Sequence, residues 1–359
     1  MASQKVPVVS LNNPVSRRAF LKGAGAIGLL SLGGLSLASC GPKAPSQVRT
    51  QFLWIKNAEF AGFYAADFKG YYEDEGLEVE LLAGGPGVDT QQIMDAKQAE
   101  VGLHGSGSAF IKAVAAGAKS TSFATVFQRS PAGLMYLMDN PIATPQDAVG
   151  KRIGIQDGAT QAWQVICAKN GLDMENDMEI VTVSYDPSPL LDGTVDGYWC
   201  YATNQPGIVR MQGYEVGVLD PWDWGFHSYG NFAMVHNDFL KSNRDTVVKW
   251  LRASIKGWVY ANENVDEVTQ YVVDTFGADY DLSYEQQLDE ATAQVDYMIS
   301  DLTDEKGLFW FDKQIWQDNI IMLDDLGELE EGGAPDVDDF TTYDILEEVY
   351  KDGKAALGQ

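Results

Sequence analysis

Two kinds of hydrophobic periodicity divide the first third of the chain into short strands and helices. Apolar and polar side chains alternate at 48–54 and again at 77–82, the pattern of half-buried strands, and a third apolar run follows at 100–105. Between the first two runs an aromatic ring recurs at every fourth position, which predicts one apolar stripe along a helix: Phe60, Tyr64, Phe68 and Tyr72. Strands separated by helices in this way favour a parallel or mostly parallel sheet.

Residues that start and stop helices support the same division. Gly70 and Gly76 are expected to end helical segments, since glycine readily adopts the left-handed conformation found just past a helix. Asp89 is placed to cap the helix after the second strand. Ser106 or Ser108 is expected to start the helix that follows the third strand.

A second copy of the pattern begins near the middle of the chain. A strand is expected at 152–156, then a helix opening near Ala159, then a strand at 179–185. The stretch 190–201 closely parallels 93–105, because in both a helix ends in a short loop and an acid leads into an apolar strand. Two similar units predict an α/β protein of two lobes, each a mostly parallel sheet flanked by helices, with the ligand cleft between them.

The chain is expected to cross between these lobes near 140–144 and near 220–231. The crossings assign residues 48–142 and 228–359 to the first lobe and residues 143–227 to the second. The remainder after Asp238 is strongly helical and is expected to pack back on the first lobe. Its first helix has apolar residues at helical spacing: Val248, Leu251, Ile255 and Val259.

The first 39 residues predict export rather than fold. A basic start, a short glycine-rich apolar stretch and small residues at its end describe a secretory signal, too short for a stable spanning helix. The stretch "SRRAFLK" resembles a twin-arginine export signature, and "LASC" resembles the lipobox of bacterial lipoproteins. We therefore expect a signal peptide at 1–39, a lipidated Cys40, a linker at 40–47 and a protein held at the outer face of the membrane; an uncleaved anchor is the alternative.

Charge and residue usage exclude several classes of function. With 25 basic and 52 acidic residues the formal net charge is −27, so the surface repels nucleic acid. The chain has 3 histidines and lacks the H-E-x-x-H and G-x-S-x-G motifs, so we expect neither an enzyme nor a metal site or cofactor. Cys167 and Cys200 could pair in an oxidising envelope, although two separate buried thiols are favoured.

Several motifs together resemble a known family. The segment "WIKNAEFAGFYAADFKGYYEDEGLEVELLAGGPG" and the later "DAKQAEVGLHGS", "DGYWCYATNQP" and "RASIKGWVYA" look like type II periplasmic binding proteins of ABC importers. More narrowly they resemble the branch related to thiamine-pyrimidine synthesis, which includes carriers for thiamine pyrimidine precursors and riboflavin. The resemblance implies the two-lobed fold of that family, a small-molecule ligand, an ABC permease as partner, membrane attachment through Cys40, and a monomer.

Candidate ligand-binding residues follow from the fold. In open α/β sheets, ligands bind beyond the carboxyl ends of the strands, where loops meet helix N-termini. Three such points lie at 54–64, 105–108 and 157–161, and more aromatic and amide side chains gather near the return crossing. The expected ligand-binding set is Trp54, Asn57, Glu59, Phe60, Phe63, Tyr64, Gly105, Ser106, Gln128, Asp157, Gly158, Ala159, Thr160, Trp163, Tyr198, Trp199, Asn204, Trp222, Trp224 and Tyr229.

Each candidate also has a structural explanation. An aromatic stripe along a helix is core more often than site, and Glu59 could be a solvated or capping carboxylate. An acid among aromatic rings nevertheless suits an aminopyrimidine, because it accepts hydrogen bonds from N–H groups while the rings stack. The leading hypothesis is therefore a lipid-anchored binding protein that delivers a flat nitrogen heterocycle to an ABC permease. The alternatives are an alkanesulfonate- or nitrate-binding protein of the same fold and a pyrimidine-forming enzyme.

Overall fold

The computed structural model describes residues 44–156, 159–330 and 333–359. The expected signal peptide, the linker up to residue 43 and the lipidated Cys40 lie outside these residues. So do Asp157 and Gly158, two of the expected ligand-binding positions. No helix in the described ranges combines the length and the apolar character needed to cross a bilayer.

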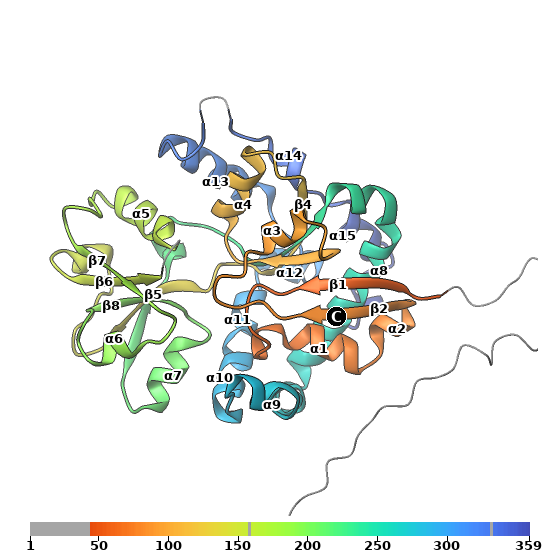
Figure 1. Ribbon diagram of the computed structural model, residues 1–359, viewed down its shortest axis with the longest axis horizontal. Helices are drawn as coiled ribbons and strands as arrows, with labels where there is room; N and C mark the ends of the chain where they lie inside the picture. Colours follow the sequence, from red (N-terminus) through yellow and green to blue (C-terminus); the bar gives the residue numbers. More distant parts are fainter. Residues whose placement is uncertain (1–43, 157–158, 331–332) are drawn as a thin grey trace, which may run out of the picture. The chain divides into compact units, whose positions relative to one another are not determined.

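The strands form two five-stranded sheets (Figure 1). The first sheet has the order β2-β1-β3-β10-β4 and the second the order β7-β6-β8-β5-β9. The strands of the first sheet are β1 (Ser46–Gln51), β2 (Leu77–Leu82), β3 (Val101–His104), β4 (Ser120–Phe127) and β10 (Gly230–His236). The strands of the second sheet are β5 (Ala132–Leu137), β6 (Arg152–Gln156), β7 (Glu179–Val183), β8 (Gly197–Tyr201) and β9 (Val216–Leu219).

Both sheets are mixed rather than mostly parallel. In the first, β1 pairs in parallel with β2 and β3, and β10 runs antiparallel between β3 and β4. In the second, β6 pairs in parallel with β7 and β8, and β5 runs antiparallel between β8 and β9. These two antiparallel strands are the points at which the chain changes sheet: it enters the second sheet at β5 and returns to the first sheet at β10. The α/β class is therefore correct, and the direction of these crossing strands is the feature the pattern missed.

The chain changes sheet earlier than the pattern indicates. Because β5 already belongs to the second sheet, the first crossing lies between β4 and β5 and not near 140–144. Both strands are almost wholly buried, and neither alternates regularly between apolar and polar residues, so periodicity alone cannot divide them. The chain returns between β9 and β10. Here the two crossings touch: the Ser130 N–H donates to the Ser228 carbonyl at 2.7 Å, and Arg129 pairs with Asp220 at 3.1 Å.

Helices cover both sheets. Those that follow strands of the first sheet are η1 (Ala58–Phe60), α1 (Ala61–Phe68), α2 (Tyr71–Asp74), α3 (Thr90–Asp95) and α4 (Gly107–Ala115). Those between strands of the second sheet are η2 (Pro145–Ala148), α5 (Thr160–Lys169), α6 (Ser188–Leu191), α7 (Gln205–Met211) and η3 (Pro221–Trp224). The helices after β10 are α8 (Asn237–Glu263), α9 (Val265–Tyr280), α10 (Tyr284–Ala293), α11 (Val295–Met298), α12 (Asp301–Lys306), α13 (Lys313–Asp325), α14 (Val337–Phe340), α15 (Asp344–Val349) and η4 (Lys354–Leu357).

The predicted helix boundaries are largely confirmed. Gly70 and Gly76 have φ angles of 75° and 72°, the left-handed conformation expected past a helix. Asp89 caps α3 by accepting from the Gln92 N–H at 3.1 Å, and Ser106 caps α4 by accepting from the Ala109 N–H at 3.2 Å.

The aromatic stripe of α1 packs into the core of the first sheet. Helix α8 lies across α1 (Figure 1), and Gly62 permits this close approach, since a Cβ at Gly62 would clash with the Trp258 ring. Phe63 stacks on Trp250 with 5.6 Å between ring centroids and meets Trp258 edge-on at 5.7 Å. Stacked and edge-to-face pairs of this kind stabilise a core beyond the area that they bury.

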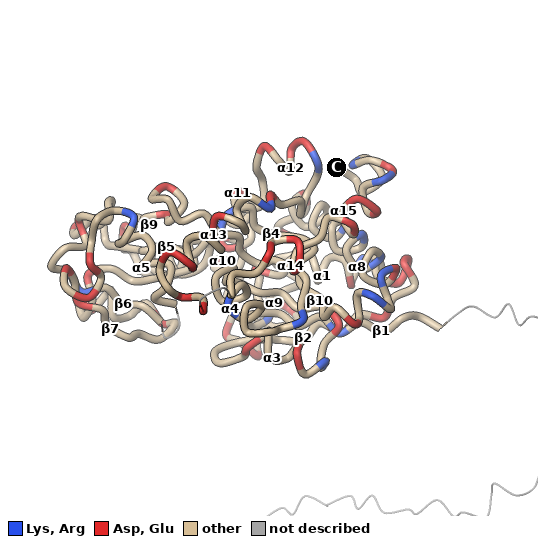
Figure 2. Tube along the Cα trace, turned by 90° about the horizontal axis from the view of Figure 1, so that it is seen from above, with Lys and Arg blue, Asp and Glu red and all other residues tan. Residues whose placement is uncertain are grey.

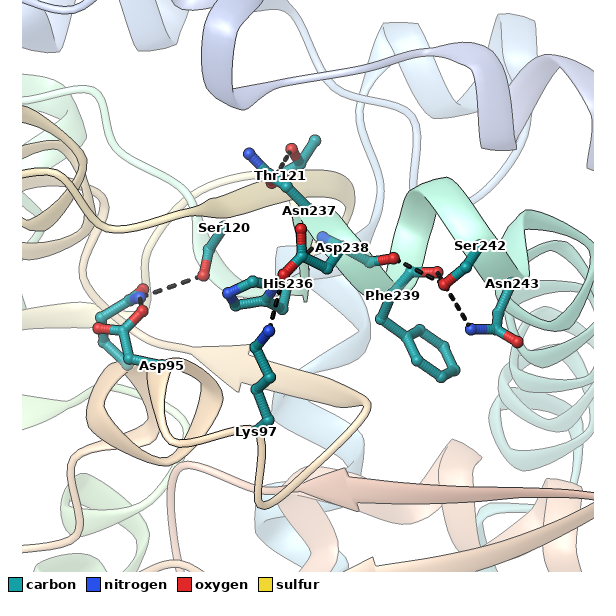
Figure 3. A network of polar contacts seen from close by, with 11 residues as sticks. Asp95, Lys97, Ser120, Thr121, His236, Asn237, Asp238, Phe239, Ser242 and Asn243 are labelled. Carbon is teal, nitrogen blue, oxygen red and sulfur yellow. Dashed lines mark hydrogen bonds and ion pairs between the residues drawn. The ribbon is translucent and has the colours of Figure 1, made fainter.

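A polar network fixes the start of α8 at the end of β10 (Figure 3). The Asp238 N–H donates to His236 Nδ1 at 3.1 Å, and the Asp238 carboxylate pairs with Lys97 at 2.7 Å. Ser242 donates to the Asp238 carbonyl, and the helix kinks one residue later at Asn243, where φ is −133°. The network therefore explains how the chain turns from the sheet into its longest helix.

Charged residues and thiols follow the expected pattern. Acidic positions are spread over helices and loops of both sheets rather than gathered in one patch (Figure 2). Cys167 and Cys200 are separate buried thiols, and burial raises the pKa of Cys167 to about 11, so it stays a thiol at neutral pH.

Candidate functional site

A cavity of about 280 Å³ lies where loops of the two sheets meet. From the first sheet it is lined by the loop that follows β1, which carries Trp54 and Asn57. From the second sheet it is lined by Tyr185, two residues after β7, and by the start of α7. The connection from α9 into α10 completes the lining. The full lining is Trp54, Ile55, Asn57, Tyr185, Asn204, Gln205, Ile208, Tyr280, Asp281, Leu282, Gln286 and Gln287.

Two aromatic rings from different sheets face each other at this cavity. Trp54 lies 4.4 Å from Tyr185 between ring centroids, with an angle of 56° between the ring planes. Trp54 is partly buried, while Tyr185 is 44% exposed. A flat molecule held between two rings needs about 7 Å, two contact distances of about 3.5 Å, so the rings must separate before a ligand can enter.

Amide side chains around a buried carboxylate form the floor. Asn57 Nδ2 donates to Glu290 Oε1 at 2.9 Å, and Gln287 Nε2 donates to Glu290 Oε2 at 3.4 Å. The Asn204 side chain, at the start of α7, lies close enough to this carboxylate to lower its pKa. Glu290 is only 1% exposed, and three cavity-lining amides from three segments lie around this one buried acid.

A second buried carboxylate lies beside the first. Glu59, in η1, is 4% exposed and accepts from Asn231 Nδ2 at 2.9 Å. Asn231 in turn accepts from the Tyr201 hydroxyl at 2.9 Å, which links β8 of the second sheet to β10 of the first. Like Glu290, Glu59 therefore acts through an amide on a contact between the two sheets.

Burial raises the pKa of both carboxyl groups. The pKa of Glu59 is raised to about 7, mainly by desolvation, against the hydrogen bond from Asn231. The pKa of Glu290 is raised to about 8 by desolvation and then by the nearby charge of Glu59, against the hydrogen bonds from Asn204 and Gln287. Near neutral pH the pair therefore holds at least one proton, and it has no need of a cation to balance two charges.

Three expected ring contacts are not at the cavity. Phe60 and Phe63 are 0% exposed and Tyr64 is 1% exposed, all within the core of the first sheet. Phe60 stacks on Phe52 with 4.1 Å between centroids and 6° between planes. These rings are turned away from the loop that carries Trp54 and Asn57 because they follow the helical stripe into the core. The alternative that such a stripe is core is the correct one for them.

The rings expected from the second sheet are also core residues. Trp163 is 0% exposed and its indole N–H donates to Met178 Sδ at 3.1 Å. Tyr198 is buried, and its hydroxyl donates to the Ser184 carbonyl at 2.7 Å, while Trp199 packs near Trp163. Of the described candidates from this sheet, Asn204 is the one that lines the cavity.

The remaining candidates lie around the crossings and at two helix starts. Trp222 packs on His227 with 4.4 Å between centroids, Trp224 packs against the second core, and the Tyr229 hydroxyl accepts from the Asp312 N–H at 2.7 Å. Gln128 is buried and donates to the Trp310 carbonyl at 2.9 Å. The others, which lie at the starts of α4 and α5, are Gly105, Ser106, Ala159 and Thr160.

Tyr185, Gln287 and Glu290 are site residues that sequence reasoning missed. Tyr185 lies two residues after the strand that ends at Val183, so the strand-end rule that identified Trp54 would have found it. No local signal identifies Glu290, which contacts Asn57 across 233 positions of sequence.

His104 is not a candidate base. Its Nδ1 accepts from the Ser106 N–H at 3.0 Å, its ring stacks on Phe232, and burial lowers its pKa to about 4. It is therefore neutral and engaged in local structure at physiological pH. No cluster of three metal-ligating side chains is present in the described part of the chain.

Comparisons with known proteins find a matching family and several relatives. The family described as NMT1/THI5 like matches residues 57–268, more than half of the chain. A riboflavin-binding protein of Chloroflexus aurantiacus is 27% identical over 285 residues, which is 75% of this chain and 78% of that protein. A formylaminopyrimidine-binding protein of Halalkalibacterium halodurans is 22% identical over 81% of this chain and 90% of that protein.

Relatives named as enzymes are also similar to this chain, and solved structures share the fold. A 4-amino-5-hydroxymethyl-2-methylpyrimidine phosphate synthase of Schizosaccharomyces pombe is 28% identical over 56% of this chain and 61% of that protein. The nitrate-binding protein of Synechocystis superposes with a TM-score of 0.64 at 15% identity, covering 86% of this chain and 89% of that one. The aliphatic sulphonate-binding protein of Escherichia coli has a TM-score of 0.60 at 14% identity, covering 79% and 94%.

Proposed function

This chain belongs to the NMT1/THI5-like family, and from that premise we propose that it is the substrate-binding protein of an ABC importer for a small, flat nitrogen heterocycle. The ligand class is that of a thiamine pyrimidine precursor or of riboflavin. The two relatives named as riboflavin- and formylaminopyrimidine-binding proteins support this assignment. The permease that would receive the ligand is part of the same proposal.

The observation that carries the proposal is the cavity lined by both Trp54 and Tyr185. Each ring comes from a loop that follows a strand of a different sheet, and amide side chains surround them. Rings stack on the faces of a planar ligand while amides read its edge, which is the chemistry that a heterocycle requires. Of the residues proposed from the sequence, Trp54, Asn57 and Asn204 remain in the proposed site, and Glu59 supports it from beneath.

The cavity is small while the two rings are in contact. Its 280 Å³ lies just below the about 300–1,000 Å³ typical of small-molecule sites. Because Trp54 and Tyr185 must separate to admit a ligand, the cavity of the bound form is larger. A pyrimidine precursor and riboflavin therefore both remain ligands of the proposal.

Electrostatics argue against an anionic ligand. Two buried carboxyl groups lie under the site, and no cation is among the residues that line the cavity. Sulfonate and nitrate need donors or positive charge, so a likeness to their binding proteins supports the fold alone. An enzyme would need an acid–base pair or metal, and His104, which ends β3 of the first sheet, is engaged elsewhere.

We propose that the ligand is trapped by closure of two lobes, each built on one sheet. The two crossings, which touch through Ser130 and Ser228, are the natural hinge. Ligand binding would stabilise the closed form through contacts made to both lobes at once. Export through the twin-arginine signature and lipidation at Cys40 remain part of the proposal. Metabolic labelling with palmitate, lost in Cys40→Ser, would test the lipid anchor.

Thermal unfolding with a ligand panel tests the function. A ligand that binds only the folded protein at a hundred times its Kd adds about 2.7 kcal/mol to the free energy of unfolding, which raises Tm by several degrees. The panel comprises 4-amino-5-hydroxymethyl-2-methylpyrimidine, its formylamino analogue, riboflavin, taurine and nitrate. We expect the pyrimidines to raise Tm. A rise with taurine or nitrate alone would overturn the heterocycle proposal.

A further inference from the structure

Glu290 lies among cavity-lining amides from three different elements. It accepts from Asn57 Nδ2 at 2.9 Å and from Gln287 Nε2 at 3.4 Å, and the Asn204 side chain lies close enough to lower its pKa. These three amides belong to the loop after β1, to α10 and to the start of α7. Glu290 itself does not line the cavity, so any effect that it has on a ligand passes through the amides.

The partners of these amides determine which way each one faces. The Ala58 backbone N–H donates to Gln287 Oε1 at 2.6 Å, and since an N–H group can only donate, the NH₂ end of Gln287 must face Glu290. Above its pKa of about 8 the Glu290 carboxylate is ionised and can only accept, so Asn57 also turns its NH₂ end toward Glu290. One N–H donor of each amide is thereby used inside the protein.

This orientation leaves an acceptor for the ligand. Asn57 is 2% exposed, and its Oδ1 has no hydrogen-bond partner among the described residues, although Asn57 lines the cavity. A buried acceptor without a partner costs free energy, and a ligand that donates a hydrogen bond there recovers it. A ligand with a carbonyl at the same place would leave two acceptors facing each other.

We propose that Glu290 is a positioning residue that determines specificity: by turning the amides it makes the site select a ligand with an N–H donor, such as the amino group of an aminopyrimidine, over one with a carbonyl there. This inference rests on the proposed function and names the ligand edge that the site reads. Glu290 lies beyond the family match at 57–268, so membership of the family does not predict it.

The surroundings of Glu290 leave the amides as its main hydrogen-bonding partners. The titratable groups that face it are Glu59 from η1, Asp289 on its own helix, Tyr64 from α1 and Tyr201 from β8. None of them carries a positive charge. Replacing Glu290 with glutamine, its neutral isostere, therefore removes the charge that turns the NH₂ ends of the amides toward this position. A glutamine side chain can present either an acceptor or a donor to each amide.

A comparison of two ligands that differ in one group tests the proposal. Calorimetric titrations at pH 8.5 would measure Kd for 4-amino-5-hydroxymethyl-2-methylpyrimidine and for its 4-oxo counterpart. The proteins are wild type, Glu290→Gln and the control Glu285→Gln, which removes the same charge at an exposed position of the same helix. We expect wild type and control to prefer the amino ligand by about tenfold or more. In Glu290→Gln the ratio should fall toward one.

The outcomes separate the two proposals. If wild type binds the amino ligand and Glu290→Gln keeps the wild-type ratio, this inference is wrong and the proposed function stands. If wild type binds neither pyrimidine, the proposed function fails and the inference fails with it. Equal weakening of both ligands in Glu290→Gln would show a purely structural role and would also overturn the inference. Thermal unfolding of each variant confirms that it is folded, so that loss of the ratio can be assigned to the site.

Discussion

Two groups of aromatic rings lie close together in sequence and differ in what surrounds them. Phe60, Phe63 and Tyr64 are sealed in the core of the first sheet, while Trp54, six residues before Phe60, faces a ring of the other sheet across a cavity. The first group follows a helical stripe, and the second follows a strand end. The difference teaches that the position within an element, rather than the local density of aromatic residues, decides which rings are available to a ligand.

The buried carboxyl groups make the same contrast on a smaller scale. Glu59 lies one residue before Phe60 yet accepts from Asn231 on the crossing strand β10. The short helix η1 therefore lies between the two environments. Its ring, Phe60, enters the core, and its acid, Glu59, turns toward the contact between the sheets. Substitutions on either side of η1 should accordingly separate stability from ligand binding.

The largest expected effect comes from truncating a core ring. Phe63→Ala removes a fully buried ring that packs on Trp250 and Trp258, and we expect it to lower the free energy of unfolding by about 3–5 kcal/mol. Trp54→Ala should change stability much less, because its ring is partly exposed, and should weaken binding of the pyrimidine by about 1–3 kcal/mol. Chemical denaturation and calorimetric titration measure the two quantities.

Trp54→Phe is the matched control for this pair, since it keeps a ring that can stack. It should retain most of the affinity that Trp54→Ala loses. The contrast between core and site would fail if Phe63→Ala abolished binding in a protein of unchanged stability, or if Trp54→Ala unfolded the chain without altering affinity.

The sequence pattern predicts the scaffold better than the site. The strand 77–82, the caps at Asp89 and Ser106 and the strand 152–156 are local features, and each is present in the structure. Asn57 could be proposed because it follows a strand end. Its partner Glu290 could not, because the contact joins residues 233 positions apart on elements whose packing no local pattern specifies.

An effect of similar size is expected from pH. Burial raises the pKa of Glu59 from 4.5 to about 7 and of Glu290 from 4.5 to about 8, so the folded protein keeps protons that the unfolded chain has released. The stabilising contribution is full below pH 4.5 and is lost as pH rises through the folded pKa values. In this window each acid lowers the free energy of unfolding by up to about 1.4 kcal/mol per pH unit.

The acidic surface also titrates, so the pH effect is best measured as a difference between proteins. Denaturation of ligand-free wild type and Glu290→Gln should give unfolding free energies that diverge between pH 5 and 8, with the variant gaining relative stability as pH rises. Glu285→Gln, at an exposed site, should stay parallel to wild type over this range. Parallel curves for Glu290→Gln would contradict the raised pKa.

The smallest effect tests whether the site closes. Arg210 on α7 pairs with Asp289 on α10 at 3.1 Å, and a Cβ at Gly207 would clash with the same carboxylate, so the two helices meet closely on opposite sides of the cavity. The charged side chains are 48% and 36% exposed, and such pairs contribute about 0.2–1 kcal/mol.

If ligand binding brings the lobes together, the pair forms in the bound state and adds that amount to affinity. A double-mutant cycle on Kd with Arg210→Gln and Asp289→Asn should then give a coupling of this size that shrinks at high salt. Strictly additive losses of affinity would mean that α7 and α10 do not approach on binding, and the rings of Trp54 and Tyr185 would then lack the motion that admits a ligand.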